Sequence, residues 1–336
     1  MTGGTSNVDF NVSSNSSEFA DGVTLNANLN LTSSSDYFKV QNGLTLNGTA
    51  NLAGNSSTLE FEGTQGLSAD VGNTATVNMG YQNSQLRVAN GGTLTLDSTV
   101  TVVGEGYVGG GGTIHNHGLV HANVNNGTLY INPATFTNDG TLRVTNSGTL
   151  RLASGVLENY GIVEMSGGGQ LVTTSLGTTG LENSLGGILQ GTGTVTGNVT
   201  NTAGTVAPGP LPGAITIEGD YVQGSDGELF IELAGFDQGT KFDFLDILGT
   251  AAISGSLKIS LLDGFLPEVT DTFVFIHADG GLSGTFGNLI DLDGNIWNVT
   301  YSPNQVSLSL LAVPEPGTHL LMALGVLYLG VRRRYA

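Results

Sequence analysis

The densest group of metal-ligating side chains in the sequence is a histidine cluster. His115, His117 and His121 are three of the five histidines in the 336-residue chain. On a strand, His115 and His117 would share one face, and histidines with this spacing can chelate Zn²⁺ or Cu²⁺. The residues from Asn116 to Gly118 are nevertheless typical of a turn, and no neighbouring carboxylate completes a ligand set. We therefore expect exposed turn histidines, and we predict neither a metal nor a cofactor.

Clustered carboxylates are a second source of possible chemistry. Asp237, Asp243 and Asp246 flank Lys241, and glycoside hydrolysis requires two carboxyl groups at a set separation. Sequence spacing does not supply that separation, and acidic residues are common throughout this chain. The stretch from Asp291 to Asn295 resembles a calcium loop, but its glycine comes fourth and an EF-hand has it sixth. We expect an Asx turn there.

Basic side chains that could hold an anionic substrate are scarce. Outside the C-terminal segment they are Lys39, Arg87, Arg143, Arg151, Lys241 and Lys258. Arg143 and Arg151 are expected on neighbouring strands of one repeat unit, where they could contact an acidic sugar. Ion pairs with Glu158 and Glu164 are the simpler interpretation.

The composition predicts an all-β protein. Glycine supplies 53 residues, and only 11% of residues are charged, against about 25% in ordinary globular domains. Glycine, threonine, serine and asparagine are residues of turns and strands. The formal net charge of −19 repels phosphate backbones, so nucleic-acid binding is excluded as a function class. With no cysteine, the chain has neither disulfides nor thiol chemistry.

A degenerate repeat of just over twenty residues organises the chain. Gly22–Asn26 (GVTLN) recurs as Gly43–Asn47 (GLTLN), and later units close on asparagines at Asn138, Asn159 and Asn183. Inside the units, apolar and polar residues alternate with the period of a strand. Asn, Asp and Gly turns separate these runs, and the four glycines at 109–112 are predicted to form a flexible turn.

A strand–turn unit of this length cannot bury its apolar face alone. Stacked coil upon coil, such units line a continuous core, which predicts a parallel β-solenoid. A leucine-rich repeat has a similar period, but it needs a denser leucine consensus and a helical side. Here glycine and threonine occupy the positions where leucines would be required.

Four segments follow from this pattern. Residues 1–206 are expected to form the β-solenoid repeats. Residues 207–213 hold three of the eight prolines, so the coils should break or change direction there. Residues 214–312 are expected to form a second, smaller all-β region with a bulkier core, which could cap the solenoid, continue it, or form a small sandwich. Residues 313–336 form a tail with one short apolar helix.

The tail has three parts in a fixed order. Pro314, Glu315 and Pro316 come first, and Arg332, Arg333 and Arg334 come last. Between them lies an apolar run consisting of Leu320, Leu321, Met322, Ala323, Leu324, Gly325, Val326, Leu327, Tyr328, Leu329, Gly330 and Val331. Extended back to Gly317 the run has 15 residues, which as a helix would span about 22 Å, less than a hydrocarbon core of about 30 Å. Arginines against the end of such a run favour the cytoplasmic side, which places the body across the membrane.

This three-part order, over Val313–Ala336, resembles the PEP-CTERM sorting signal. The resemblance implies export by the secretion machinery of a Gram-negative bacterium that makes extracellular polysaccharide. It also implies recognition and cleavage by exosortase, a membrane cysteine transpeptidase. Carried over by position, Pro314–Pro316 form the recognition motif, Leu320–Val331 the membrane anchor and Arg332–Arg334 the basic stop signal. The protein would be anchored transiently by its C-terminus and would then reach the cell surface or the extracellular space.

Such proteins need a secretory signal peptide. Met1–Phe10 has neither a basic n-region nor an apolar h-region, so we expect a leader upstream of Met1. The alternative is a tail-anchored cytoplasmic body, which would move Arg332–Arg334 outward across the membrane, against the charge rule.

A second resemblance covers the middle of the chain. Gly191–Gly209 and Ile215–Gln223 are similar to the β-helical repeats of autotransporter passenger domains. The resemblance implies a right-handed β-helix. It assigns no activity, because that scaffold carries adhesins and enzymes alike.

These observations predict an exported, non-catalytic surface or extracellular-matrix protein. Exosortase, the secretion machinery and extracellular polysaccharide are the expected partners. The alternatives are a β-helical polysaccharide-degrading enzyme and a carbohydrate-binding adhesin. β-Helical polysaccharide-cleaving enzymes use clustered aspartates with a nearby histidine, or calcium with arginine and lysine, and this sequence has no adjacent pair of aspartates. Exposed aromatic stripes would favour the adhesin.

Overall fold

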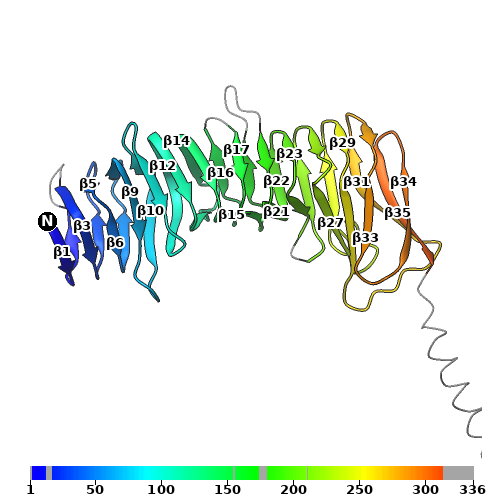
Figure 1. Cartoon of the computed structure of the whole chain (residues 1–336), viewed down its shortest axis with the longest axis horizontal. Helices are drawn as coiled ribbons and strands as arrows, with labels where there is room; N and C mark the ends of the chain where they lie inside the picture. The colour runs from blue at the N-terminus through cyan, green and yellow to red at the C-terminus, as the bar shows by residue number, and fades with distance from the viewer. Residues whose placement is uncertain (1, 13–16, 154–155, 174–179, 210, 313–336) are drawn as a thin grey trace, which may run out of the picture.

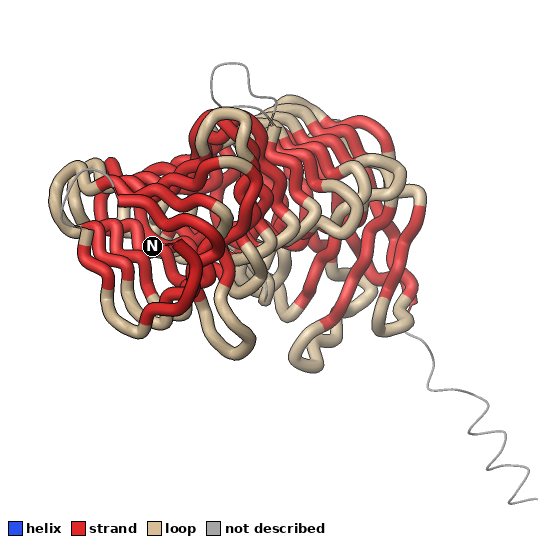
Figure 2. The backbone as a smooth tube through the Cα atoms, turned by 60° about the vertical axis from the view of Figure 1, so that its left-hand side comes forward, coloured by secondary structure: helices blue, strands red, loops and turns tan. Residues whose placement is uncertain are grey.

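The computed structural model describes residues 2–12, 17–153, 156–173, 180–209 and 211–312. Within these ranges every regular element is a strand, and the strands form one 35-stranded sheet that winds into an elongated, bent body with the N-terminus at one end (Figure 1). Figure 2 shows the strands of successive coils lying one above another. The all-β prediction is confirmed, and the parallel strands form a solenoid-like sheet.

Each coil contributes one strand to each of three faces, and the strands of a face pair in parallel. The first face stacks β3 (Ser17–Leu25), β5 (Tyr37–Gln41), β8 (Thr58–Glu62), β10 (Ala75–Val88), β12 (Val100–Asn116), β14 (Thr128–Asn138), β16 (Thr149–Leu152), β19 (Gln170–Val172), β22 (Gly193–Thr196), β25 (Ala214–Ile217), β28 (Phe244–Ile247) and β31 (Thr272–Ala278).

The long strands β3, β10, β12 and β14 bend around a corner and therefore belong to more than one face. Parts of β3, β12 and β14 join the second face, whose other strands are β1 (Thr2–Ser6), β6 (Leu44–Leu46), β9 (Thr64–Ser68), β11 (Thr93–Leu96), β17 (Leu157–Asn159), β20 (Leu181–Asn183), β23 (Val199–Asn201), β26 (Tyr221–Gln223), β29 (Ala251–Ile253) and β32 (Leu282–Gly284).

The third face completes each coil. With parts of β10 and β12 it stacks β2 (Phe10–Asn11), β4 (Leu29–Leu31), β7 (Thr49–Leu52), β13 (Leu119–Ala122), β15 (Thr141–Val144), β18 (Ile162–Met165), β21 (Ile188–Gly191), β24 (Thr205–Ala207), β27 (Glu228–Leu233), β30 (Ser256–Leu261) and β33 (Asn288–Asp291).

The core forms because inward-facing residues of successive coils lie at paired positions. Alternate residues of each strand are buried, which is the pattern expected when one face of a pleated strand meets the core. One column on the third face is fully buried over six coils and consists of Leu142, Val163, Leu189, Val206, Leu229 and Leu257. Burying each such side chain stabilises the fold by about 1.5–3 kcal/mol. No coil could bury its residues without the neighbours above and below.

A buried ladder of asparagines runs along the second face. Asn116, Asn138, Asn159, Asn183 and Asn201 occupy consecutive coils, and none is exposed to solvent. Each of the first four donates a side-chain N–H to the side-chain oxygen of the next, at 2.7–2.9 Å. These side chains also donate to backbone carbonyls at the corner, and thereby satisfy groups that would otherwise be buried without partners. The asparagines that close the repeat units therefore hold the corner of each coil.

The parallel ladders run past the proline-rich segment on all three faces. β22 pairs with β25, β23 with β26 and β24 with β27 across residues 207–213. Pro208 and Pro212 lie between β24 and β25, outside the strands, where their missing N–H groups interrupt no ladder. Residues beyond 213 continue the coils as far as β33.

The coils become longer in this last part. Asn138 and Asn159, partners in adjacent coils, are 21 residues apart, whereas Asp246 and its partner His277 are 31 residues apart. The body then ends in the antiparallel pair β34 (Ile296–Tyr301) and β35 (Gln305–Ala312), with β35 also antiparallel to β31.

The helix expected in the tail lies outside the described residues. The part of the chain that the structure describes has no helix of the length and apolarity needed to cross a membrane.

Candidate functional site

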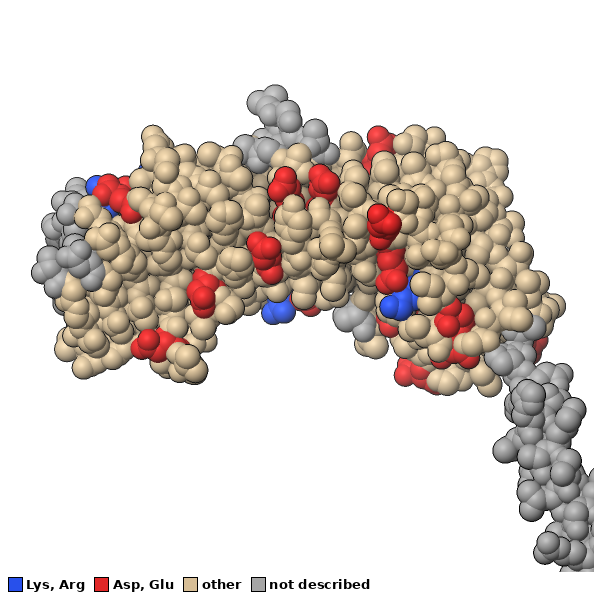
Figure 3. All heavy atoms as spheres, viewed as in Figure 1, with Lys and Arg blue, Asp and Glu red and all other residues tan. Residues whose placement is uncertain are grey.

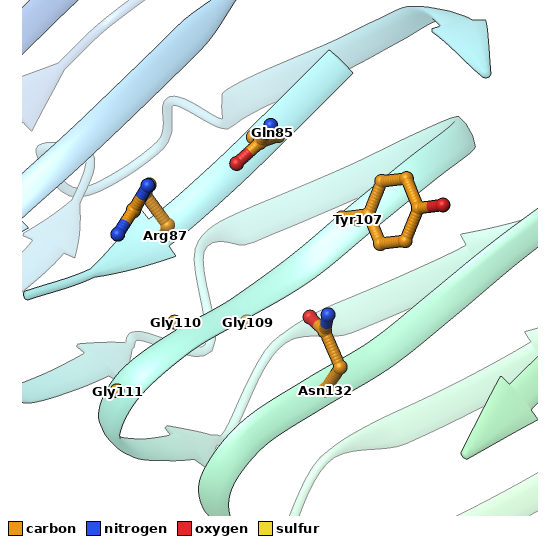
Figure 4. A pocket seen from close by; sticks show the side chains of 7 residues that line it. All are labelled: Gln85, Arg87, Tyr107, Gly109, Gly110, Gly111 and Asn132. Carbon is orange, nitrogen blue, oxygen red and sulfur yellow. The ribbon is translucent and has the colours of Figure 1, made fainter. Parts of the chain in front are cut away.

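A hollow of about 420 Å³ lies on the first face of the solenoid (Figure 4). Three successive strands supply its lining. Gln85 and Arg87 come from β10, Tyr107 and Gly109–Gly111 from β12, and Asn132 from β14. Figure 4 shows the four side chains around the bare glycine stretch of β12. No carboxylate and no imidazole is among the residues that line it.

The glycine run creates the space. Arg87, Gly109 and Asn132 occupy paired positions on consecutive strands, and the side chain of Asn132 lies over Gly109, in the space that a Cβ atom would need. A Cβ atom built on Gly109 would lie 1.7 Å from the Asn132 Oδ1 atom, and one on Gly111 would lie 1.7 Å from the Asn90 Oδ1 atom. Glycine also lets a ligand approach the backbone closely. The predicted flexible turn at 109–112 is wrong, because these residues belong to strand β12 and pair with strands on both sides.

Arg87 is held at the edge of the hollow by a buried carboxylate. Its Nε atom lies 2.8 Å from Oε2 of Glu60, which is 7% exposed. The hydroxyl of Tyr37 donates to the other carboxylate oxygen of Glu60. Burial, and then this contact with Glu60, raises the pKa of Tyr37 above its usual range, so the phenol stays protonated. Glu60 therefore fixes the position of the guanidinium from one side.

Two polar atoms at the hollow have no hydrogen-bond partner within the described ranges. They are Nε of Arg87 and Oδ1 of Asn132, and both are shielded from solvent. Although Arg87 Nε is close to Glu60, its N–H does not point at the carboxylate with hydrogen-bond geometry. Buried polar groups are nearly always paired, and Nε of Arg87 has the carboxylate of Glu60 beside it. Oδ1 of Asn132 is therefore the atom at the hollow whose hydrogen bond a ligand or an ordered water would complete.

An aromatic stack adjoins the hollow. Tyr107 and Tyr130 occupy paired positions on β12 and β14, and their rings lie parallel with centroids 4.7 Å apart and an interplanar angle of 12°. The next paired position is Arg151 on β16, an exposed side chain that forms no ion pair with any residue that the structure describes. Gln85, Tyr107, Tyr130 and Arg151 therefore form one outward row across four coils.

The three clustered histidines lie in different environments. His115 and His121 lie in β12 and β13, where their ring nitrogens contact the hydroxyls of Thr137 and Thr145 at 2.6 and 2.9 Å. Only His117 lies exposed at a corner, as expected for all three. Burial, with Arg143 nearby, lowers the pKa of His121. The described residues contain no group of three or more metal-ligating side chains that could hold an ion.

The carboxylates near Lys241 have separate roles. Asp243 is buried, and its two oxygens accept the backbone N–H groups of Gly213 and Glu232, both at 2.8 Å. Burial raises the pKa of Asp243 to about 8. Asp246 lies on the outer surface, 3.1 Å from Nδ1 of His277. Asp243 therefore connects segments of the backbone and does not face Asp246.

The remaining sequence predictions concern turns and ion pairs. The Asx turn is confirmed, because Oδ1 of Asp291 accepts the N–H groups of Asp293 and Asn295. Arg143 and Arg151 lie on neighbouring strands, β15 and β16, and Arg143 pairs with Glu164 at 3.0 Å. No ion pair joins Arg151 to Glu158 within the described part of the chain. On the face shown in Figure 3, acidic side chains are spread along the body, and the few visible Lys and Arg lie beside them.

Sequence reasoning did not find the hollow. Arg87, Tyr107 and Asn132 come from three different coils, and only the coil register shows that they are neighbours. One feature of the sequence could have indicated the hollow. The glycine run follows the alternating strand pattern of Val100–Val108 without an intervening polar turn, which is consistent with a strand that continues through the glycines.

The tail residues named from the sequence, 314–316 and 320–334, lie outside the described residues. No curated protein matches the chain. Among protein families, the PEP-CTERM protein-sorting motif matches residues 312–334, a range that includes the Pro-Glu-Pro sequence, the apolar run and the three arginines. The chain therefore carries a PEP-CTERM protein-sorting motif at residues 312–334, the signal of an exported protein that exosortase processes.

Proposed function

We propose that this chain is an exported, non-catalytic surface or extracellular-matrix protein that is sorted through its C-terminal segment. The match of residues 312–334 to the PEP-CTERM motif carries the proposal. The motif implies export, C-terminal membrane anchoring and processing by exosortase. The producing cell is a Gram-negative bacterium, and the processed protein is found at the cell surface or in the extracellular polysaccharide.

Each part of the tail has its own role in this proposal. Pro314 and Pro316 lack backbone N–H groups and disfavour helix, so they hold the recognition motif extended and accessible to the protease. Leu320–Val331 forms a membrane-spanning helix. Arg332–Arg334 stays in the cytoplasm, because each arginine at the centre of a membrane helix costs about 2.5–3.5 kcal/mol.

The body serves as a rigid spacer with an adhesive surface. Uninterrupted parallel ladders and a continuous core support the spacer role. We assign the coils a right-handed winding, as in the autotransporter passenger repeats that Gly191–Gly209 resembles. The residues that line the hollow offer no pair of carboxyl groups for glycoside hydrolysis.

A carbohydrate-binding adhesin is the second candidate. The parallel stack of Tyr107 and Tyr130 beside the hollow favours it, since aromatic side chains present a flat apolar surface with a polar edge.

The sorting proposal can be tested in a host that has exosortase. With a leader supplied upstream of Met1, the exported protein should lack the segment from about Gly317 onward. Replacing Pro314, Glu315 and Pro316 with alanine should leave an uncleaved precursor in the membrane, because the protease no longer recognises it. Intact mass spectrometry of the exported and membrane fractions measures both outcomes.

The control replaces Pro303, an exposed proline of the body, with alanine. This variant should be cleaved and exported like the unmodified protein. Exported material from the unmodified chain that still carries Tyr335 and Ala336 would show that the sorting proposal is wrong.

A further inference from the structure

We propose that the hollow over Gly109–Gly111 is a binding site for an acidic, uronate-containing oligosaccharide. The carboxylate of one sugar unit pairs with Arg87, a neighbouring sugar ring packs against Tyr107, and the oligosaccharide extends across the coils towards Arg151. The inference adds a ligand class to the proposed function, but it concerns the folded body alone and does not depend on sorting.

The guanidinium of Arg87 is the main reason to expect an anion. Its Nε atom forms an ion pair with Glu60 at 2.8 Å, while its two terminal Nη groups, which carry four of the five N–H donors, form no hydrogen bond with any described residue. Glu60 belongs to strand β8, which pairs with β10 on the side opposite the hollow. Because arginine recognises planar carboxylates through two parallel hydrogen bonds, a uronate carboxylate satisfies donors that the protein leaves unsatisfied. Glu60 and Tyr37 hold the arginine in place beforehand, which reduces the ordering needed on binding.

The other residues that line the hollow indicate that the rest of the ligand is a sugar. Gln85 and Asn132 each provide an amide, and the Oδ1 atom of Asn132 is buried without a partner, so it can accept a hydrogen bond from a hydroxyl group. Tyr107 offers an apolar ring that Tyr130 supports from one side. Gly109–Gly111 add no side chains of their own to the hollow, so the amides of Asn132 and Asn90 lie close to the strand, where a sugar hydroxyl can approach them. Many hydroxyls, one carboxylate and a flat C–H face are the features of a uronate ring.

The direction of the ligand follows from the second basic group. Strands in a sheet are about 4.8 Å apart, so the coils of Arg87 and Arg151 are separated by about 14 Å, three strand spacings along the solenoid. Tyr107 and Tyr130 lie between them. Arg151 is exposed and has no carboxylate partner within the described ranges, in contrast to Arg143, which pairs with Glu164 on the third face. Arg87 is ion-paired through Nε alone, and Arg151 has no ion pair within the described ranges, so the two guanidinium groups and the aromatic stack between them give this otherwise acidic surface a local site for a linear chain with repeated carboxylates.

The test is calorimetric titration of the full chain in mild detergent. One arm uses a defined hexamer of galacturonic acid, and the other uses the same hexamer with its carboxyl groups reduced to alcohols. The uronate hexamer should bind, and the neutral hexamer should bind about tenfold more weakly or worse, because a hydrogen bond to a charged group contributes about 1.5–3 kcal/mol. Equal binding of the two hexamers, or no binding of the uronate at millimolar concentration, would overturn the proposal.

Variants separate this site from general charge attraction. Arg87→Lys keeps the charge but loses the planar pair of donors, and it should weaken uronate binding about tenfold. Arg151→Ala removes an unpaired surface charge and should weaken binding about two- to fivefold, as expected for an exposed ionic contact. Gly111→Val should displace Asn90, whose Oδ1 atom occupies the position of the added Cβ, and should crowd the hollow without changing any charge, so the hexamer should no longer bind.

Arg143→Ala is the matched control, because it removes an arginine from a different face. It should leave the affinity unchanged. If it weakens binding as much as Arg151→Ala does, the uronate is attracted by scattered charge and the proposed site is wrong. Far-ultraviolet circular dichroism and thermal midpoints establish that each variant is folded. Arg151→Ala breaks no ion pair within the described ranges, so it keeps the proposal testable if Gly111→Val does not fold. The titration uses no host and no exosortase, so its outcome is separate from that of the sorting experiment.

Discussion

The narrow coils from β12 to β26 and the wide coils after β27 use different devices to close the same solenoid. In the narrow coils, adjacent partners such as Asn138 and Asn159 are 21 residues apart, and an asparagine ladder holds one corner. In the wide coils the spacing reaches 31 residues. At the boundary, Gln223 takes the place of the next asparagine and donates to the carbonyls of Ser254 and Ser256, while Tyr221 donates to its side-chain oxygen.

The extra residues of the wide coils supply an aromatic cluster. Phe236 and Phe242 come from the segment between β27 and β28, and Phe265 comes from the segment between β30 and β31. All three contact the fully buried Phe273, at centroid distances of 5.2–6.0 Å within the cluster, and Trp297 of β34 lies against it as well. Where no further coil follows, large side chains cover the end of the core. The difference shows that a repeated hydrogen-bond ladder stabilises the middle of the solenoid, whereas large aromatic side chains cover the core at its end.

The largest expected effect is at the centre of the aromatic cluster. Phe273→Ala should lower the free energy of unfolding by about 3–5 kcal/mol, because it leaves a cavity among four other rings. In a solenoid the loss should be local, so amide hydrogen exchange should accelerate in residues 244–312 and remain slow in the narrow coils. Phe230→Ala is the control, since the Phe230 ring lies under Lys258 on the outward side of β27, and it should cost about 1 kcal/mol or less. Uniform acceleration along the whole chain would contradict the division into two regions.

A smaller loss is expected in the asparagine ladder. Asn159→Leu keeps the side-chain volume but removes the acceptor for Asn138 and the donor for Asn183. Leaving these buried groups unpaired should lower the stability by about 2–3 kcal/mol, measured by denaturant unfolding, with faster exchange centred on β14, β17 and β20. The exposed Asn125→Leu should be neutral. If both variants unfold alike, the ladder does not stabilise the narrow coils.

The junction of the two regions should respond to pH. Asp243 joins Gly213, which precedes β25, to Glu232 in β27, and burial raises its pKa to about 8. A raised folded-state pKa means that the folded protein holds a proton that the unfolded chain, with a pKa near 4, has released. Stability from this group is therefore lost as the pH rises towards 8, by at most about 1.4 kcal/mol per pH unit.

Between pH 5.5 and 7.5 we expect a decrease of about 1–2 kcal/mol in the unfolding free energy, because the two backbone N–H groups partly offset the cost of the charge. The asparagine of Asp243→Asn has no proton to lose in this pH range, so the decrease in unfolding free energy with pH should disappear. This holds even if the substitution changes the stability at any single pH. Denaturant melts of both proteins at three pH values measure the difference in slope. Parallel slopes would show that Asp243 keeps an ordinary pKa.

The general architecture follows from local patterns. Alternation of apolar and polar residues predicted strands, because a residue's face in a strand depends only on whether its position is odd or even. The repeat of just over twenty residues predicted parallel stacking, since one coil cannot bury its own apolar face. Likewise, the order of Pro314–Pro316, the apolar run and Arg332–Arg334 could be read from the sequence and matches a known motif, because a sorting signal is recognised as a linear segment.

The site depended on information that local patterns do not contain. Coil length varies, with ladder partners Asn159 and Asn183 24 residues apart and Asn183 and Asn201 only 18 apart, so the register cannot be obtained by counting. Gly109–Gly112 has the composition of a turn, but pairing with strands on both sides holds it extended. The amino-acid sequence alone determined the strand period, the coiled architecture and the sorting motif. Only the tertiary structure decided that Arg87, Tyr107 and Asn132 surround one hollow, because their proximity arises from hydrogen bonds between coils and not from spacing along the chain.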